Sequence, residues 1–227
     1  MRLDKYLADM SVGTRSEVKK LISKGHIRVN NAVVKAADFK VDDNDHVFYD
    51  DEEIKYVEYE YYILNKPQGY LSATEDKYDP TVMDLIKSKR KDLSPVGRLD
   101  KDTEGLLLIT NDGQLTHNLL NPNKHVDKKY YVEVDKTIPS NAEEFFSKPM
   151  DLGDFVAKPA KYEKITNASA YLTISEGKFH QVKRMFEKIG TNVIFLKRVE
   201  FKNLNLNNLK TGEYRPLTEE EINELKK

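Results

Sequence analysis

Residues 97–113, GRLDKDTEGLLLITNDG, join a charged loop to a short apolar run. Five of the seven residues at 98–104 are charged, and residues 106–109 are all Leu or Ile. An apolar run of this length, ended by Asn111, Asp112 and Gly113, predicts a buried strand followed by a turn. A loop at the end of a rigid strand holds its side chains in fixed positions. Residues 98–104 are therefore candidates for a reactive site, although an ordinary solvated loop has the same pattern.

Similar strand patterns, with a few helices between them, flank this segment on both sides. Strands are predicted at 61–65, 106–110, 129–134 and 170–174, and helices at 81–86 and 180–189. Thr218 and Glu221 form the spacing of a capping box, which predicts a final helix. The sequence therefore predicts an α+β domain over residues 61–227, built on a mainly antiparallel mixed sheet flanked by helices.

The N-terminal part reads as a smaller module of two helices and short strands. Apolar spacing predicts a helix over 2–10, and a capping box at Thr14 and Glu17 predicts a second helix that ends at Gly25. Strands are predicted at 26–30, 32–34 and 46–49. Residues 50–60 are interpreted as a linker. The predicted domain is residues 1–55.

The net charge of −1 conceals a strong asymmetry along the chain. Residues 1–41 carry nine Lys and Arg against four Asp and Glu, whereas residues 42–60 carry nine Asp and Glu against one Lys. A basic module in front of a nearly neutral body favours a polyanionic partner. The expected phosphate contacts are basic residues on the second helix and the strand after it: Arg15, Lys19, Lys20, Lys24 and Arg28. A solvated helix face is the plain alternative, and a DNA-reading helix-turn-helix is a second one.

Several kinds of site are disfavoured by composition. The chain has no cysteine and only five histidines, so disulfides, thiolate nucleophiles and a metal site are not expected. No apolar run approaches the ~20 residues that a membrane span needs. No secretion signal is recognised at the N-terminus, and a cytoplasmic location is expected.

The segment at 97–107 resembles the active-site motif of the pseudouridine synthases, and more narrowly that of the RsuA family, which acts on small-subunit ribosomal RNA. Four further segments resemble family motifs in the same order along the chain: LNKPQGY at 64–70, DKKYYV at 127–132, SEGKFHQVKRMF at 175–186 and GEYRPLT at 212–218. The basic module resembles the S4-type RNA-binding domain that precedes such enzymes. The resemblance covers nearly the whole chain.

The resemblance implies roles for individual residues. Asp100 is the expected catalytic carboxylate, and Lys183 is the expected cation beside it, with Arg184 as the alternate. Tyr130 is expected to stack on the flipped uracil, while Tyr131 faces the other side of its strand and is expected in the core. Arg98, two residues before Asp100, is expected to fill the gap left by the flipped base or to bind a phosphate. Asp102 and Glu104 are interpreted as loop structure.

The resemblance also implies a substrate and a reaction. The expected partner is 16S ribosomal RNA or a small-subunit assembly intermediate, with the uridine at position 516 as the target, and the protein is expected to act as a monomer. No cofactor is expected, because the isomerisation is redox-neutral. Three alternatives stay open: the same reaction on 23S ribosomal RNA, a non-catalytic ribosome-assembly protein that binds RNA, and a glycosidase that uses Asp100 with Glu104. Attack at C1′ and attack at C6 of the uridine are both possible.

Overall fold

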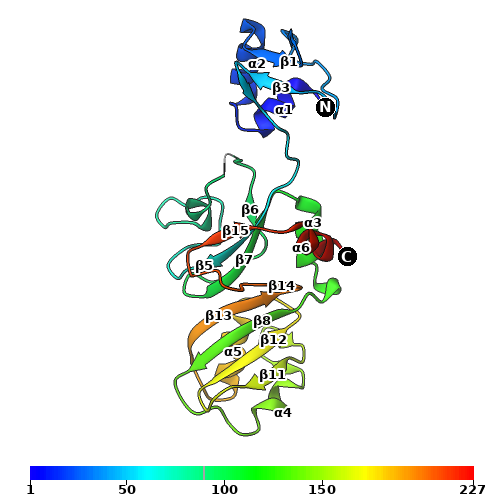
Figure 1. Cartoon of the computed structure of the whole chain (residues 1–227). Helices are drawn as coiled ribbons and strands as arrows, with labels where there is room; N and C mark the ends of the chain where they lie inside the picture. The colour runs from blue at the N-terminus through cyan, green and yellow to red at the C-terminus, as the bar shows by residue number, and fades with distance from the viewer. Residues whose placement is uncertain (89) are drawn as a thin grey trace. The chain divides into compact units, whose positions relative to one another are not determined.

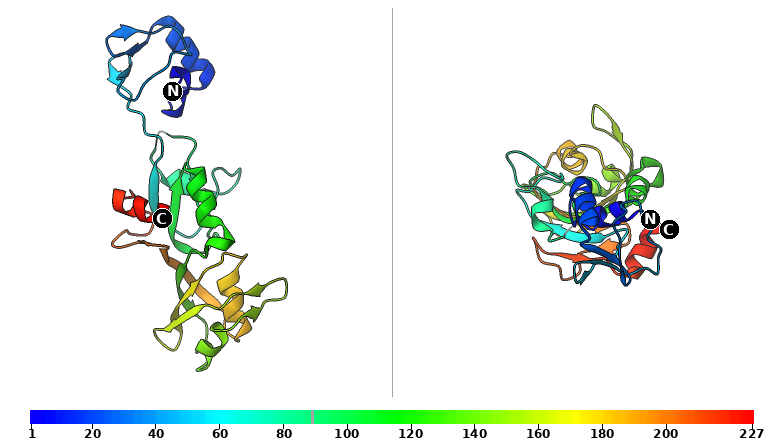
Figure 2. Two further views of the ribbon diagram at one scale, coloured as in Figure 1. Left: turned by 90° about the vertical axis from the view of Figure 1, so that its right-hand side faces the viewer. Right: turned by 90° about the horizontal axis from the view of Figure 1, so that it is seen from above.

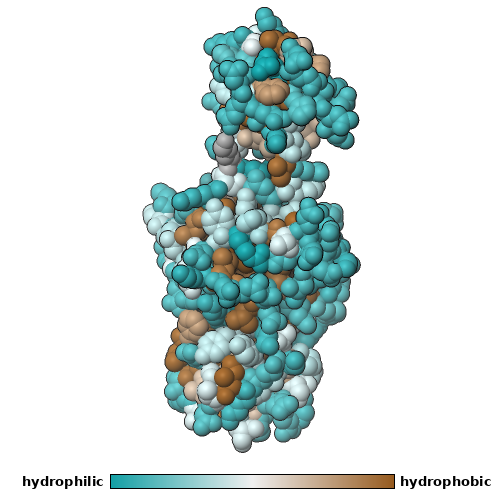
Figure 3. All heavy atoms as spheres, viewed as in Figure 1, coloured by the Kyte–Doolittle hydropathy of each residue, from teal (hydrophilic) through white to brown (hydrophobic). Residues whose placement is uncertain are grey.

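The computed structural model describes residues 1–88 and 90–227, which form two compact units. The first unit comprises Met1–Tyr59 and Lys87–Asp92, and the second comprises Glu60–Ile86 and Leu93–Lys227. Charged and polar side chains cover most of the surface that Figure 3 shows, with apolar side chains scattered among them. No helix in the described residues is both long and apolar enough to span a bilayer.

The first unit is two helices packed on a small antiparallel sheet. Its elements are α1 Leu3–Asp9, α2 Arg15–Lys24, β1 Ile27–Val29, β2 Ala32–Val33, β3 Val47–Tyr49 and β4 Glu52–Glu53, with the strand order β2-β1-β3-β4. The capping box of α2 is present as predicted: the Thr14 hydroxyl accepts from the Glu17 amide, and the Glu17 carboxylate accepts from the Thr14 amide. Gly25 ends α2 with φ +86°, a left-handed conformation that glycine adopts freely.

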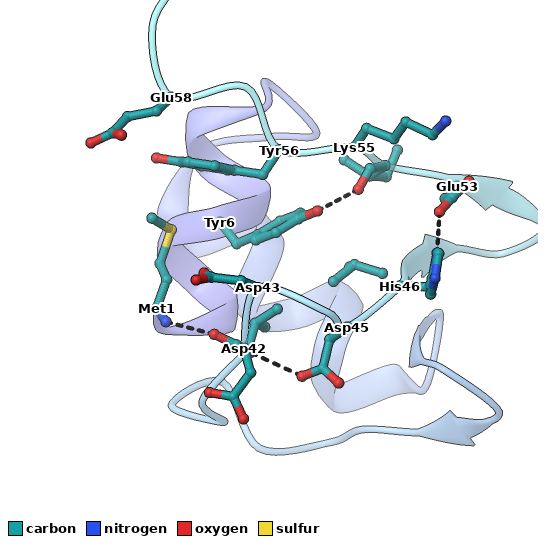
Figure 4. Close-up of a pocket in the computed structure, with 13 residues that line it drawn as sticks. Met1, Tyr6, Asp42, Asp43, Asp45, His46, Glu53, Lys55, Tyr56 and Glu58 are labelled. Carbon is teal, nitrogen blue, oxygen red and sulfur yellow. Dashed lines mark hydrogen bonds and ion pairs between the residues drawn. The ribbon is translucent and has the colours of Figure 1, made fainter.

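The prediction of a linker at 50–60 is wrong for most of that range, because residues up to Tyr59 belong to the first unit. Residues 52–53 form β4, which pairs with β3. Tyr56 packs on Tyr6, with ring centroids 5.1 Å apart, and the Tyr6 hydroxyl donates to the Ile54 carbonyl at 2.6 Å. Figure 4 shows these rings beside the first helix, near the hydrogen bond from the N-terminal amine to Val41. The carboxylates at 50–60 are typical of a solvated linker, but the contacts of Tyr6 with Tyr56 and Ile54 hold this segment against the first unit.

The second unit is built on a large mixed sheet. Among the described residues the sheet has nine strands, in the order β11-β12-β8-β13-β7-β5-β15, with β14 beside β13 and β6 beside β7. Figure 1 shows these strands side by side. Their bounds are β5 Tyr61–Lys66, β6 Ser94–Pro95, β7 Glu104–Thr110, β8 Lys128–Val134, β11 Lys161–Lys164, β12 Ser169–Ile174, β13 Val193–Phe201, β14 Leu204–Asn205 and β15 Tyr214–Pro216. A separate pair is β9 Met150–Asp151 and β10 Val156–Ala157.

Helices pack on both faces of this sheet. The 3-10 helix η1 Val82–Leu85, α4 Ala142–Phe146 and α5 Gln181–Lys188 contribute to one apolar cluster, whereas α3 Gly113–Leu120 and α6 Glu219–Lys226 contribute to the other. A short 3-10 turn, η2 Pro122–Lys124, follows α3. Figure 2 shows α5 against one face of the neighbouring strands. The predicted α+β class and mainly antiparallel mixed sheet are confirmed, since β7 and β13 are a parallel pair among antiparallel ones.

The strand β7 lies between these two clusters, which explains its continuous apolar sequence. Leu107 and Ile109 belong to one cluster, and Leu106 and Leu108 to the other. At Gly105 the chain has φ +110°, and an added Cβ would lie 2.2 Å from the Arg198 carbonyl oxygen of β13. Only glycine permits this approach. The glycine thus fixes the start of β7, directly after the charged loop.

The turn predicted at 111–113 is instead the start of a helix. The Asp112 carboxylate accepts from the Leu115 amide at 2.9 Å and caps α3. Asp and Gly are common both in turns and at helix starts, so the local sequence did not distinguish them.

Candidate functional site

The loop that carries Asp100 is held by hydrogen bonds to its backbone. Leu99 is buried between Arg98 and Asp100, so these two side chains point away from the core. The Ser72 hydroxyl accepts from the Leu99 amide at 3.0 Å and donates to the Leu99 carbonyl at 2.9 Å. The Thr103 amide donates to the Asp100 carbonyl at 3.0 Å. The loop is therefore ordered without any use of the Asp100 carboxylate.

Lys66, at the end of β5, holds the same loop through hydrogen bonds to its backbone carbonyls. Its side chain is fully buried, and its Nζ donates to the carbonyls of Asp100 at 3.0 Å, Thr103 at 2.9 Å and Pro67 at 3.0 Å. Burial lowers the pKa of Lys66 to about 8, against the opposing effect of nearby carboxylates. No role for Lys66 was expected from the sequence. The available signal was a lysine in the segment LNKPQGY at 64–70, at the end of a strand that is polar only at Asn65 and Lys66.

We expect Lys66→Met to lower turnover about tenfold, because a catalytic group displaced by a fraction of an ångström loses much of its alignment. The substitution keeps most of the stem but leaves the loop carbonyls of Asp100, Lys101 and Thr103 without their donor. Hydrogen exchange should speed up at the Thr103 amide, which bonds within the loop. Lys129→Met is the matched control, because Lys129 pairs with Glu163 elsewhere in the sheet. Unchanged turnover in Lys66→Met would show that the loop does not depend on this anchor.

The Asp100 carboxylate lies beside two basic groups from α5 and the loop before it. Its Oδ2 is 3.2 Å from the Lys183 Nζ and 3.5 Å from the His180 Nε2. Lys183 also donates to both carboxylate oxygens of Asp102, at 2.7 and 2.9 Å. Asp102, interpreted from sequence as loop structure, therefore shares the lysine with Asp100. His180 and Asp102 are members of this cluster that sequence reasoning missed.

The pKa values in this cluster reflect the shared lysine. Burial alone would lower the pKa of Lys183, but hydrogen bonds and charge from Asp102 and Asp100 outweigh it, and the pKa is raised. Burial alone would raise the pKa of Asp102, but the hydrogen bond and charge of Lys183, with a backbone hydrogen bond and His180, together outweigh it, and the pKa is lowered. Lys183 is consequently a cation, and Asp102 a carboxylate, across the neutral range.

Arg184, the alternate partner for Asp100, contacts other residues instead. Its guanidinium pairs with Asp154, donates to the Leu152 carbonyl and lies 4.9 Å from the centre of the Phe155 ring. Helical geometry explains the difference, because consecutive residues of a helix point about 100° apart. Of Lys183 and Arg184, only Lys183 lies beside Asp100 in the described residues.

A small pocket brings the predicted residues together. It is lined by Arg98, Asp100 and Tyr130, with Thr103 and His180 beside them. Tyr130 is buried on β8, and the Thr103 hydroxyl is buried without a hydrogen-bond partner in the described part of the chain. The pocket therefore combines an aromatic wall, a carboxylate and a free hydroxyl.

The expectation that Tyr131 is the core residue is wrong. Tyr131 is only half-buried, packs edge-on against Tyr171 and Phe195, and donates to Glu133 at 2.6 Å. Tyr130, on the other face of β8, is the buried one and belongs to the larger apolar cluster. The alternation of the strand was right, but the face that meets the core was reversed.

The predicted RNA contacts of the first unit fall into two groups. Val18 and Ile22 bury one side of α2, while the exposed side carries the basic residues Arg15, Lys19, Lys20 and Lys24. Arg28 differs, because it lies on β1, half-buried, 4.8 Å from the centre of the Phe48 ring and 3.9 Å from Asp51. The four helix residues therefore form an exposed basic surface, and Arg28 is partly engaged within the unit.

Comparison with known proteins agrees with this arrangement. Residues 60–188 match the RNA pseudouridylate synthase family, and residues 1–47 match the S4 domain. The chain is 45% identical to an uncharacterized RNA pseudouridine synthase, YtzG, of Bacillus subtilis, covering 98% of this chain and 97% of that one. It is 39% identical to the ribosomal small subunit pseudouridine synthase A of Escherichia coli, over 98% of both chains.

A solved structure described as a pseudouridylate synthase is similar over the whole length. The two share 36% identity with a TM-score of 0.71, and the match covers 99% of each chain. The segments at 64–70, 97–107, 127–132 and 175–186, on which the resemblance rested, lie inside the matched range 60–188. The chain is a pseudouridine synthase that belongs to the RNA pseudouridylate synthase family and carries an S4 domain at its N-terminus.

Proposed function

We propose that this enzyme converts one uridine of 16S ribosomal RNA, at position 516, into pseudouridine, with Asp100 as its catalytic carboxylate. The full-length similarity to a relative named ribosomal small subunit pseudouridine synthase A supports the choice of RNA. The observation that carries the mechanism is the pocket in which Asp100, held against Lys183, faces the buried ring of Tyr130.

The reaction breaks the N1–C1′ bond of uridine, turns the uracil and forms a C5–C1′ bond; N1 ends protonated, and the proton of C5 is released. A base stacked in RNA cannot reach Asp100, so the uridine is flipped into the pocket. Asp100 supplies the oxygen nucleophile, at C1′ or at C6, and the bond that it forms is broken again before pseudouridine leaves, so the carboxylate is regenerated. Lys183 holds that carboxylate ionised and oriented, while Tyr130 packs against the uracil face. Arg98 occupies the space that the flipped base leaves or binds a neighbouring phosphate.

The geometry does not favour a glycosidase that pairs Asp100 with Glu104. Glu104 begins β7 and bonds to Lys197 and Thr211, whereas Asp100 bonds to Lys183. The two carboxylates thus contact different lysines. An isomerisation also needs no second carboxylate, because no leaving group departs.

Mapping pseudouridine in ribosomal RNA from cells with and without the protein tests the proposed target. We expect a single site in 16S RNA to disappear. Purified enzyme with a 16S transcript, and with assembling small-subunit particles, then identifies the form of the substrate. Loss of a site in 23S RNA would assign the large subunit instead, and no change in either RNA would favour a binding role in assembly.

We further propose that residues 1–55 bind the RNA and that residues 61–227 carry out the reaction, in a monomeric cytoplasmic enzyme. Replacing four basic residues on α2 with Gln should weaken RNA binding and lower the slope of log affinity against log salt by about 3, because each phosphate contact contributes about 0.7–0.9 to that slope. The four residues are Arg15, Lys19, Lys20 and Lys24.

Substitution is a cleaner test than truncation here. The segment Lys87–Asp92 belongs to the first unit, so removing residues 1–55 would take away most of the unit to which that segment belongs. A control of equal charge replaces four exposed lysines of the second unit, Lys148, Lys161, Lys164 and Lys227. The same slope in both variants would contradict an RNA-binding role for α2.

A further inference from the structure

Phe179 is the most exposed phenylalanine of the described chain, and its ring is ordered by stacking. It is 74% exposed, and it lies parallel to the His180 imidazole, with centroids 3.8 Å apart and planes at 18°. His180 has φ +50°, a conformation uncommon for a residue with a side chain. One face of the Phe179 ring is therefore covered by His180, and the other faces solvent.

The pair forms part of a hollow that adjoins the pocket of Asp100. The hollow has a volume of about 690 Å³, and Phe179, His180, Leu71 and Ala73 are among the residues that line it. Arg98, Asp100 and Lys178 line both this hollow and the smaller pocket. His180 also lies 3.5 Å from Asp100, so it contacts both the carboxylate and the Phe179 ring.

The charges around the hollow favour an anionic ligand. Lys101 pairs with Asp79 at 2.7 Å, and the Asp76 carboxylate accepts from two backbone amides. Arg98 and Lys178 are exposed, and neither forms an ion pair within residues 1–88 and 90–227. An open aromatic face next to two unpaired cations matches a nucleotide, with its base on the ring and its phosphate at the cations.

We propose that the outer face of Phe179 stacks an unpaired nucleobase adjacent to the target uridine, with the intervening phosphate at Arg98 and Lys178. The proposal rests on the proposed function, because it takes Asp100 as the position of the reacting base. The target base itself is placed in the smaller pocket beside Asp100 and Tyr130, which Phe179 does not line. Stacking on an aromatic ring tolerates any base, so this subsite recognises an unpaired neighbour rather than a sequence.

The test combines a protein variant with an altered RNA. Phe179→Ala should raise the Kd for the substrate RNA about tenfold, while Phe179→Trp should keep it near the wild-type value. An RNA with an abasic residue beside the target uridine should bind wild type and Phe179→Ala equally, because the base that stacks is missing. Phe145→Ala on α4 is the control, since Phe145 is also exposed and does not line the hollow.

The outcomes separate this inference from the proposed function. If wild type forms pseudouridine and Phe179→Ala binds intact RNA as tightly as wild type does, the stacking subsite is wrong and the proposed function stands. Equal weakening of Phe179→Ala on intact and on abasic RNA would also overturn the subsite, because the ring would then act through something other than that base. If wild type forms no pseudouridine in 16S RNA, the proposed target fails, while a Kd that depends on Phe179 and on the neighbouring base still supports the subsite.

Discussion

Asp100→Asn is expected to lower the single-turnover rate of pseudouridine formation at least about a thousandfold, as loss of a nucleophile does in other enzymes. The side chains have nearly the same shape, and the loop is held by Ser72 and Lys66 through its backbone, so the fold should not change. Only the charge and the nucleophilic oxygen are lost. RNA affinity should stay within about threefold of the wild-type value, because the change falls on the chemical step.

Asp102→Asn is the matched control for this prediction. Asp102 lies in the same loop and bonds to the same lysine, but it does not line the pocket. We expect a loss of no more than about tenfold, because Lys183 keeps its contact with Asp100. Asp100→Ala, which cannot regain a carboxylate by deamidation, should be as inactive as Asp100→Asn. A large residual rate in both Asp100 variants would remove Asp100 from the mechanism.

Local signals in the sequence predicted helix starts and buried strands well. The capping boxes at Thr14 and Thr218 are both formed, with their glutamates three residues later. These features depend on residues a few positions apart, so they can be recognised without knowledge of the fold. The same local reasoning mistook the cap of α3 at Asp112 for a turn.

The central strand β13 was missed because its pattern is set by distant contacts. Lys197 and Arg198 interrupt its apolar residues, yet Arg198 is buried, with its Nε donating to the Leu106 carbonyl at 2.7 Å. That carbonyl is 92 residues away in sequence. A charged residue in such a place looks solvated until its partner is known.

The same limit applies to the candidate site. Asp100, Arg98, Tyr130 and Lys183 were predicted through motifs, and the structure brings them together, while their roles in the reaction stay predictions. Asp102 was interpreted as loop structure, and its contact with Lys183, 81 residues away, cannot be recognised in the sequence. A shared cation between two carboxylates is a property of the fold, which no spacing in the sequence displays.

Lys183→Met is expected to lower the single-turnover rate by about 10²–10³-fold, comparable to the loss of one strong electrostatic contact in an active site. Methionine keeps much of the stem but leaves Asp100 and Asp102 without the cation that they share. RNA affinity should change little, because Lys183 is turned toward the two carboxylates. A lysine that bound phosphate would give the reverse result.

The pH profile distinguishes a positioning role from a merely structural one. In the wild type Lys183 lowers the pKa of Asp102. The stabilisation from the ion pair between Asp102 and Lys183 is therefore fully present above the ordinary carboxyl pKa, and it is lost as the pH falls through the lowered pKa of Asp102. Without the cation, burial is left to raise the pKa of Asp102. In Lys183→Met, protonation of Asp102 removes one of the two facing carboxylate charges, as Asp102→Asn does, so part of the lost rate should return as the pH falls into the range where Asp102 takes up a proton.

Two further variants complete this test. Lys183→Arg restores a cation and should recover part of the rate, since a guanidinium keeps the charge but not the geometry. Lys183→Met combined with Asp102→Asn should be less impaired at neutral pH than Lys183→Met alone, because one of the two facing carboxylates is removed. The measurements are single-turnover rates against pH, beside an equilibrium titration with RNA. If binding falls while the saturated rate holds, Lys183 contacts the RNA backbone, and His180, 3.5 Å from the same oxygen, becomes the group that holds Asp100.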